Sequence, residues 1–125
     1  MKIKLINTLK NLEDNIIDTN TVIAEKEKNK ITYQIDDFNF ILKIISPSTL
    51  ILNRCNQNLE CTMYFELNKT TSSIYTFKEE GYNLEINIKT TYLNITSEKI
   101  EIHYNVIDSN TSYEYHIEMS ECYEY

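Results

Sequence analysis

The two histidines of this chain lie in neighbouring segments that could pair with each other as strands. His103 and His116 each belong to a run in which polar and apolar residues alternate. If residues 108–111 form the turn between the two runs, Val106 pairs with Tyr113 and His103 lies opposite His116. Directly opposed side chains are close enough to share a metal ion.

Three glutamates accompany the histidines on the predicted polar face, namely Glu101, Glu114 and Glu118. Imidazole and carboxylate groups are ordinary zinc ligands, so the five side chains form a candidate metal site. The alternative is a solvated sheet surface, where carboxylates pair with many partners at little gain in stability. A register change of one residue would also destroy the arrangement. We favour the solvated surface, and we predict neither a metal nor another cofactor.

Cys55 and Cys61 flank a short turn and could approach each other. A redox pair is normally spaced more tightly and lies beside a helix N-terminus, so strand-end thiols are the favoured interpretation. The sequence also contains no nucleophile elbow, HExxH motif or Walker phosphate loop. We therefore predict that the chain is not an enzyme.

Strands are the elements predicted to position these side chains, because polar and apolar residues alternate along most of the chain. The clearest stretch covers residues 83–119 and indicates a meander of long antiparallel strands. Tyr104, Tyr113 and Tyr115 lie on the apolar face of this meander. Gly81, the only glycine, is expected to supply a backbone angle at the preceding turn that other residues rarely adopt.

The N-terminal third of the chain gives a mixed pattern. Leu5, Leu9, Leu12 and Ile16 are spaced as on one face of a helix. Residues 2–5 alternate instead, and the polar residues that follow position 10 suit a turn. We predict strand, turn and strand here, with a short helix as the alternative. The whole chain then contains about eight to ten strands and almost no helix.

A long antiparallel sheet with exposed edges would pair with other sheets, and this chain has one proline, Pro47, to blunt such edges. Closing the sheet is the simplest solution. We therefore predict one domain, residues 1–125, folded as an all-β, antiparallel up-and-down barrel. The bulky inward residues favour a filled interior, but buried phenol hydroxyls need partners. The three tyrosines could line a partly wet cavity or lie near a barrel mouth.

The chain carries a formal net charge of −7, and Arg54 is its only arginine. Nucleic-acid binding needs clustered Lys and Arg, so neither nucleic acid nor an anionic membrane surface is expected as a partner. Residues 1–10 lack the apolar run of a signal peptide, and no segment approaches the length of a transmembrane helix. We expect an acidic cytoplasmic protein whose three cysteines, Cys122 included, are reduced.

A set of these segments, taken in order, carries a resemblance to a known family. The set comprises residues 2–6, 31–33, 73–77, 84–91, 100–106 and 115–119, together with Gly81. In this order they resemble the YwiB-like family of small bacterial proteins of unknown function, over nearly the whole chain. An extra residue between Tyr75 and Gly81, and a lower glycine content, depart from that pattern and put the local turn in doubt. The resemblance implies a calycin-like barrel related in shape to lipocalins, and it brings no catalytic residues with it.

Two functions are compatible with these expectations. The first is a non-catalytic binding protein that holds a small, partly apolar ligand in or at the mouth of the barrel, beside Tyr104, Tyr113 and Tyr115. The alternative is a structural or protein-interaction module with a filled barrel core, which would meet a protein partner or a second copy of itself.

Overall fold

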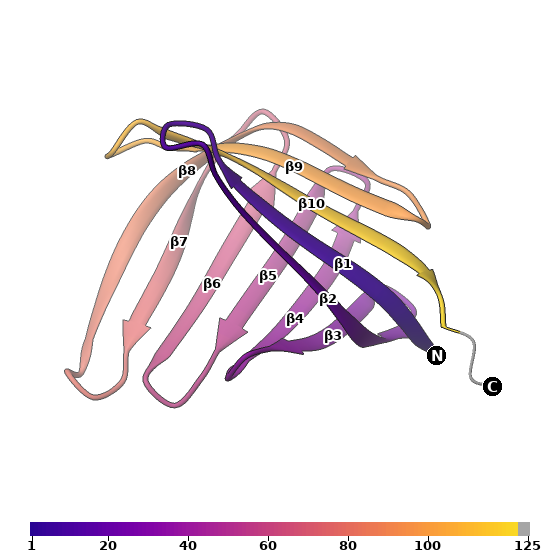
Figure 1. Cartoon of the computed structure of the whole chain (residues 1–125). Helices are drawn as coiled ribbons and strands as arrows, with labels where there is room; N and C mark the ends of the chain where they lie inside the picture. Colours follow the sequence, from indigo (N-terminus) through magenta and orange to yellow (C-terminus); the bar gives the residue numbers. More distant parts are fainter. Residues whose placement is uncertain (123–125) are drawn as a thin grey trace.

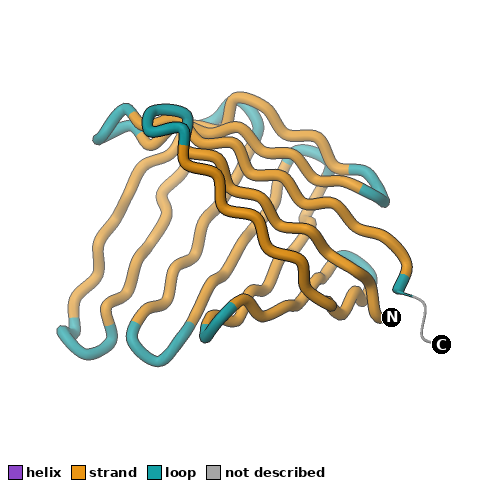
Figure 2. Tube along the Cα trace, viewed as in Figure 1, coloured by secondary structure: helices purple, strands orange, loops and turns teal. Residues whose placement is uncertain are grey.

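The computed structural model describes residues 1–122, which form ten strands closed into one antiparallel barrel (Figure 1). The described residues contain strands and turns but no helix (Figure 2). Each strand pairs with the next along the chain, and β1 closes the barrel against β10. The strands are β1 (Lys2–Asn11), β2 (Ile16–Glu27), β3 (Lys30–Ile35), β4 (Phe38–Ser46), β5 (Thr49–Cys55), β6 (Leu59–Glu66), β7 (Thr70–Phe77), β8 (Tyr82–Ile95), β9 (Lys99–Val106) and β10 (Thr111–Glu121). The predicted all-β up-and-down barrel is confirmed.

The predicted domain was assigned to residues 1–125, of which residues 123–125 lie outside the described part. None of the described residues belongs to a helix long and apolar enough to cross a membrane.

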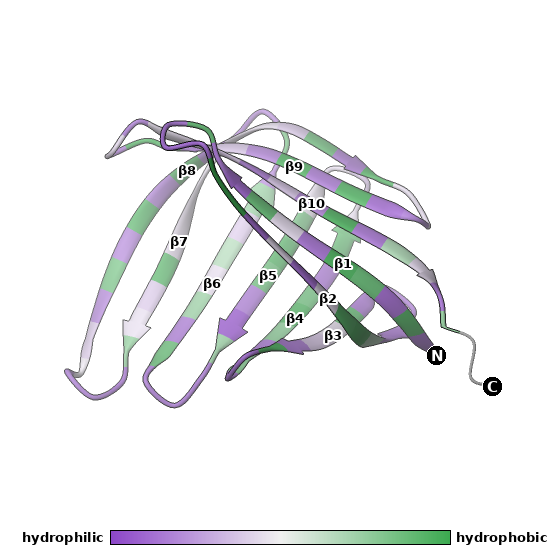
Figure 3. Cartoon of the chain, in the orientation of Figure 1, coloured by the Kyte–Doolittle hydropathy of each residue, from purple (hydrophilic) through white to green (hydrophobic). Residues whose placement is uncertain are grey.

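Alternating side chains build the core, as the banded hydropathy along each strand shows (Figure 3). Apolar residues point into the barrel and polar residues point outward, because successive side chains of a strand face opposite sides of the sheet. Burial is most complete toward the end where the N-terminus and the turn between β4 and β5 lie, which we call the packed end. The fully buried side chains there are Leu5, Ile31, Leu42, Leu50, Ile100 and Ile117.

The N-terminal third folds as strand, turn and strand, so the helix considered for it is wrong. β1 pairs with β2 along the whole length of β1, from Lys2 with Glu25 to Asn11 with Ile16. The side-chain oxygen of Asn11 accepts hydrogen bonds from the backbone N–H groups of Glu13, at 3.0 Å, and Asp14, at 3.4 Å. These local bonds favour a turn over a helix, which explains why the leucine spacing misleads.

Gly81 has φ +69°, so the predicted left-handed backbone angle is confirmed. Its N–H donates to the carbonyl of Phe77 at 2.9 Å and closes the turn between β7 and β8. Glycine adopts this conformation without the strain that a Cβ atom brings, which suits it to this position.

The turn between β9 and β10 differs from the prediction by one residue at each end. It comprises residues 107–110, and Asn110 adopts a left-handed conformation at φ 51°. Val106 therefore pairs with Thr111 rather than with Tyr113. The register shifts by two residues, and a shift of two leaves every side chain on its predicted face. The predicted pairing is thus wrong, whereas the predicted faces are right.

Candidate functional site

A cavity of about 190 Å³ lies inside the barrel, toward the end opposite the packed end. We call this the cavity end, and the turns between β5 and β6, β7 and β8, and β9 and β10 lie there. The lining side chains come from seven strands, which only a closed sheet can bring together. They are Leu9, Phe40, Leu52, Arg54, Cys61, Met63, Phe65, Tyr75, Tyr104, Tyr113 and Tyr115.

All three predicted tyrosines border this cavity. Tyr104 and Tyr113 are directly opposed on β9 and β10, and their rings stack with centroids 5.3 Å apart. Tyr104 also packs on Phe65, at 5.2 Å between ring centroids. The stacked rings form an aromatic wall, because the two-residue period of the strands keeps them on one face. Whether they bind a ligand stays a prediction.

The hydroxyl of Tyr115 is held inside the wall by two residues that the sequence analysis missed, Asn7 and Tyr33. Tyr115 donates a hydrogen bond to the side-chain oxygen of Asn7, and its oxygen lies 3.1 Å from that of Tyr33. Tyr33 in turn stacks on Phe40 at 4.9 Å. Burial raises the pKa of Tyr115 to about 12, although its bond with Tyr33 and the charge of Arg54 oppose that rise. Tyr115 is therefore a neutral, fixed part of the wall.

Arg54 is the cation of the cavity, and its place in the barrel is unusual for a charged residue. Its guanidinium carbon lies 5.1 Å from the centre of the Phe38 ring. Its Nε is buried and has no hydrogen-bond partner among residues 1–122. The described residues that line the cavity include no acidic side chain to pair with it. An unpartnered buried donor on a cation is costly, so this atom needs an explanation.

The sequence did contain a signal for Arg54. On β5 the inward positions are Leu50 and Leu52, and the alternation places Arg54 next in that series. As the only arginine of the chain, Arg54 counted at first only against nucleic-acid binding. Carrying the alternation two residues further would have placed the only arginine of the chain inside the barrel.

Cys61 and Tyr75 complete the polar part of the lining. Burial raises the pKa of the Cys61 thiol, against smaller effects of Tyr75 and Arg54. Burial likewise raises the pKa of Tyr75 to about 12, with a further contribution from Cys61. Both groups are therefore neutral near pH 7, and neither a thiolate nor a phenolate is available as a nucleophile.

Cys55 and Cys61, which the sequence allowed to approach each other, lie on opposite faces of the sheet. Cys61 is buried in the interior, whereas Cys55 is half-buried and its sulfur lies 3.1 Å from Nζ of Lys78. Because Arg54 pairs with Cys61 and Cys55 pairs with Glu60, the two thiols belong to alternate positions. Cys55, Cys61 and Cys122 are all free thiols. The interpretation as ordinary strand thiols agrees with this arrangement.

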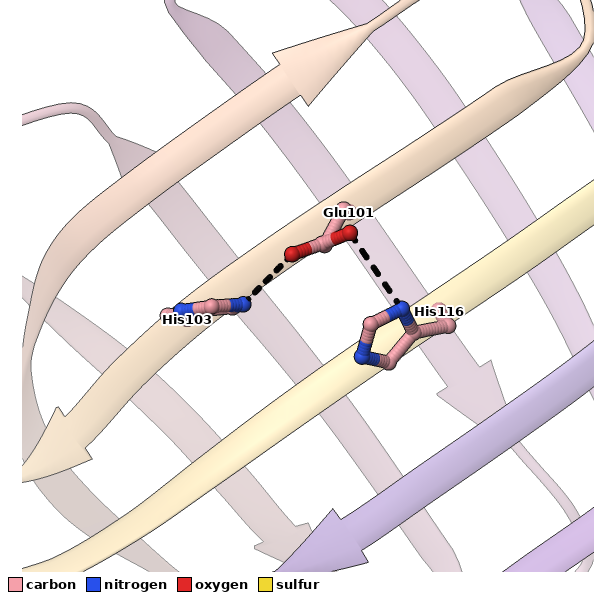
Figure 4. A group of neighbouring side chains, drawn as sticks. All are labelled: Glu101, His103 and His116. Atoms are coloured by element: carbon pink, nitrogen blue, oxygen red, sulfur yellow. Dashed lines mark hydrogen bonds and ion pairs between the residues drawn. The ribbon is translucent and has the colours of Figure 1, made fainter.

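The candidate metal ligands lie on the outer face of β9 and β10, where Glu101 contacts both histidines (Figure 4). Glu101 Oε2 lies 2.7 Å from Nε2 of His103, and Glu101 Oε1 lies 3.5 Å from Nδ1 of His116. Glu114 pairs directly with His103, and His116 pairs directly with Glu101. The histidines are thus diagonal rather than opposite neighbours, and Glu118 lies outside the group that could share an ion.

A lysine stabilises the charged form of Glu101. Nζ of Lys99 lies 3.1 Å from Oε1 of Glu101. Desolvation alone would raise the pKa of Glu101, but hydrogen bonds from Lys99 and His103 and the charge of His116 hold it below its usual value. Glu101 is therefore held in its charged form, with the Lys99 ammonium and two imidazoles beside it.

The closed ten-stranded sheet with a cavity at one end defines the class of this protein as a small up-and-down β-barrel. No family model and no curated protein matches the chain. Among solved structures it is similar to the YwiB protein from Bacillus subtilis, with a TM-score of 0.67 and 17% sequence identity. The match covers 98% of this chain and 91% of that chain. At this identity the likeness concerns the fold, and in the fold the resemblance predicted from the sequence is confirmed.

Proposed function

We propose that this protein is a non-catalytic binding protein whose barrel holds one small, partly apolar ligand. The observation that carries the proposal is the cavity, which has an aromatic wall and a single cation, the half-buried Arg54 with its buried Nε. The neutral state of its thiol and tyrosine hydroxyls near pH 7 supports a binding role over a catalytic one.

The volume of the cavity limits the size of the ligand. Drug-sized pockets span roughly 300–1,000 Å³, which exceeds the 190 Å³ available here. An apolar cavity of about 150 Å³ in another protein binds benzene. A molecule with one ring and a short substituent therefore fits, whereas a long acyl chain does not.

The positive charge of Arg54 favours a ligand that carries a negative charge. A guanidinium presents several N–H donors in a fixed plane, which match the two oxygens of a carboxylate. A carboxylate in the cavity would satisfy the buried Nε and neutralise the charge that the described lining residues leave unpaired. The ligand class is therefore a small carboxylic acid with one ring, whose apolar part contacts Tyr104 and its stacked partner Tyr113.

The open end of the barrel would let a ligand reach the cavity. Leu84 pairs with the cavity-lining Tyr75 and belongs to the same inward-facing series as Ile88. Leu84 is nonetheless 45% exposed, and its neighbour Tyr82 is 54% exposed. Inward positions that remain exposed mark the place where the sheet is open to solvent.

The experiment compares benzoate with benzamide, which has nearly the same shape and no charge. Titration of the full chain, followed by the NMR shifts of its tyrosine rings, should show saturable binding of benzoate. Benzamide should bind at least about tenfold more weakly, because it cannot neutralise Arg54. Native mass spectrometry of protein drawn from its own cells should show a retained small mass.

Other outcomes favour the alternative function. A retained polypeptide, or a dimer with no small mass, would indicate the interaction module instead. Benzoate shifts that avoid the cavity tyrosines, or equal binding of benzamide, would contradict the carboxylate proposal.

A further inference from the structure

The outer face of β9 and β10 carries a second cluster of side chains that is separate from the cavity. Glu101, His103 and His116 each offer one donor atom, and these three atoms all lie within 4.8 Å of one another. We propose that they bind one divalent transition-metal ion, with zinc as the ion that suits the ligands best. Two imidazoles and a carboxylate form a common zinc ligand set, with a fourth position left for water.

The spacing of the donors agrees with a tetrahedral ion. Zinc bonds to nitrogen and oxygen of about 2.1 Å place neighbouring ligand atoms about 3.4 Å apart. Glu101 Oε1 and Nδ1 of His116 are 3.5 Å apart. Glu101 Oε2 and Nε2 of His103 are 2.7 Å apart, in direct hydrogen-bond contact. The two contacts use different oxygens of Glu101, so insertion of the ion requires the shorter contact to open by less than about 1 Å and the carboxylate to turn one oxygen toward both nitrogens.

Glu114 lies beside both histidines and is placed to accept a hydrogen bond from His116. Its Oε2 lies 3.7 Å from Nε2 of His116, and its Oε1 lies 3.5 Å from Nε2 of His103. Nε2 of His116 is buried and makes no hydrogen bond within residues 1–122. When Nδ1 of a histidine binds a metal, its Nε2–H normally donates to a carboxylate, and Glu114 is the carboxylate in place.

The strands hold these side chains in fixed positions. β9 and β10 pair continuously from Thr111 with Val106 to Glu118 with Lys99, so the backbone beneath the cluster is rigid. The ring of His103 packs on Tyr92, with centroids 4.8 Å apart. A register shift in β8 between Thr90 and Tyr92 brings Tyr92 opposite His103. Lys99 is the competing cation, and the ion would displace it from Glu101.

The experiment uses zinc alone as the probe, with full-length, untagged protein that has been treated with a chelator. Calorimetry should show one equivalent of zinc bound to the wild type. His116→Ala and His103→Ala should each weaken the binding at least about 100-fold, because each removes a ligand. Glu114→Gln should weaken it about tenfold or more, because the carboxylate that orients the His116 ring loses its charge. Substituting cobalt for zinc should give the visible absorption of a tetrahedral site.

Two control variants separate this site from other zinc ligands. Glu118→Gln changes an exposed carboxylate on the same face of β10, and zinc affinity should stay as in the wild type. Cys55→Ser removes a half-buried thiol, and zinc affinity should again be unchanged. Circular dichroism checks that each variant folds. Wild-type affinity in the His103→Ala, His116→Ala double variant, or loss of binding in Cys55→Ser, would overturn the proposal.

Discussion

The packed end and the cavity end of the barrel belong to the same ten strands, yet their interiors differ in kind. The packed end is filled by branched aliphatic side chains such as Leu50 and Ile117, which are fully buried. The cavity end has tyrosines, a thiol and Arg54 among the side chains that line a cavity of about 190 Å³. A sheet of ten strands encloses more volume than side chains of one size can fill throughout. The difference indicates that the packed end provides stability and the cavity end provides a site.

The largest expected effect comes from removing a side chain at the packed end. Ile117→Ala should lower the free energy of unfolding by about 2–5 kcal/mol, because it deletes fully buried methyl groups and leaves a void. Ile23→Ala is the matched control, since Ile23 is 55% exposed, and it should change stability by less than about 1 kcal/mol. Urea unfolding measures both. Similar losses in the two variants would show that the packed end is not the stabilising region.

High pH should weaken the cavity end selectively. Tyr115 has its pKa raised to about 12, whereas an unfolded tyrosine titrates near 10. The folded state therefore keeps the proton longer, and the stability from this group is complete below pH 10 and lost as pH rises to 12. The loss should reach about 3 kcal/mol. Tyr75 acts in the same direction.

Urea unfolding at pH 8 and at pH 11.5 measures this dependence. Tyr115→Phe is the control, because the variant cannot ionise there and its stability should fall less steeply. Appearance of the Tyr115 phenolate near pH 10 in the folded protein would contradict the predicted burial.

A smaller effect should separate two tyrosines of the cavity end. Tyr115→Phe should lower the free energy of unfolding by about 1–2 kcal/mol, because it removes one of two donors to the buried oxygen of Asn7 and leaves only the Tyr33 hydroxyl, at 3.4 Å. Tyr113→Phe should change it by less than about 0.5 kcal/mol, since Tyr113 is only half-buried and its ring contacts are retained. Thermal unfolding of both variants gives the comparison, and equal losses would show that the bond to Asn7 is not stabilising.

The sequence predicts most of the fold because the strands and their inner faces follow from the local alternation of polar and apolar residues. Alternation along residues 83–119 places Tyr104, Tyr113 and Tyr115 on the inner face, and the structure agrees. The register of β9 and β10 was missed, since it depends on the left-handed conformation of Asn110, which the residue type permits but does not require.

The cavity was only partly predictable for a different reason. The network of Asn7, Tyr33 and Tyr115 joins three strands that lie up to 108 positions apart in the chain. Its formation depends on closure of the barrel, which pairs β1 with β10. Local patterns carry no information on such distant pairs, so the tyrosines could be placed on a face but not in contact with their partners.

Arg54 offers the sharpest test of the comparison, although its expected effect on stability is small. Arg54→Met keeps the length of the side chain and removes a half-buried cation whose buried Nε has no hydrogen-bond partner among the described residues. Replacing such a charge with an apolar side chain is often neutral or stabilising, so the free energy of unfolding should stay equal or rise by about 1 kcal/mol. Benzoate binding should fall at least about tenfold in the same variant.

Opposite signs for stability and binding are the signature of a residue retained for a site rather than for the fold. Leu52→Met serves as the matched control, because it alters the neighbouring inward position of β5 without changing charge. It should cost less than about 1.5 kcal/mol and leave the preference for benzoate over benzamide intact. If Arg54→Met instead unfolds the protein while benzoate affinity per folded molecule is unchanged, Arg54 belongs with the packed end as a structural residue.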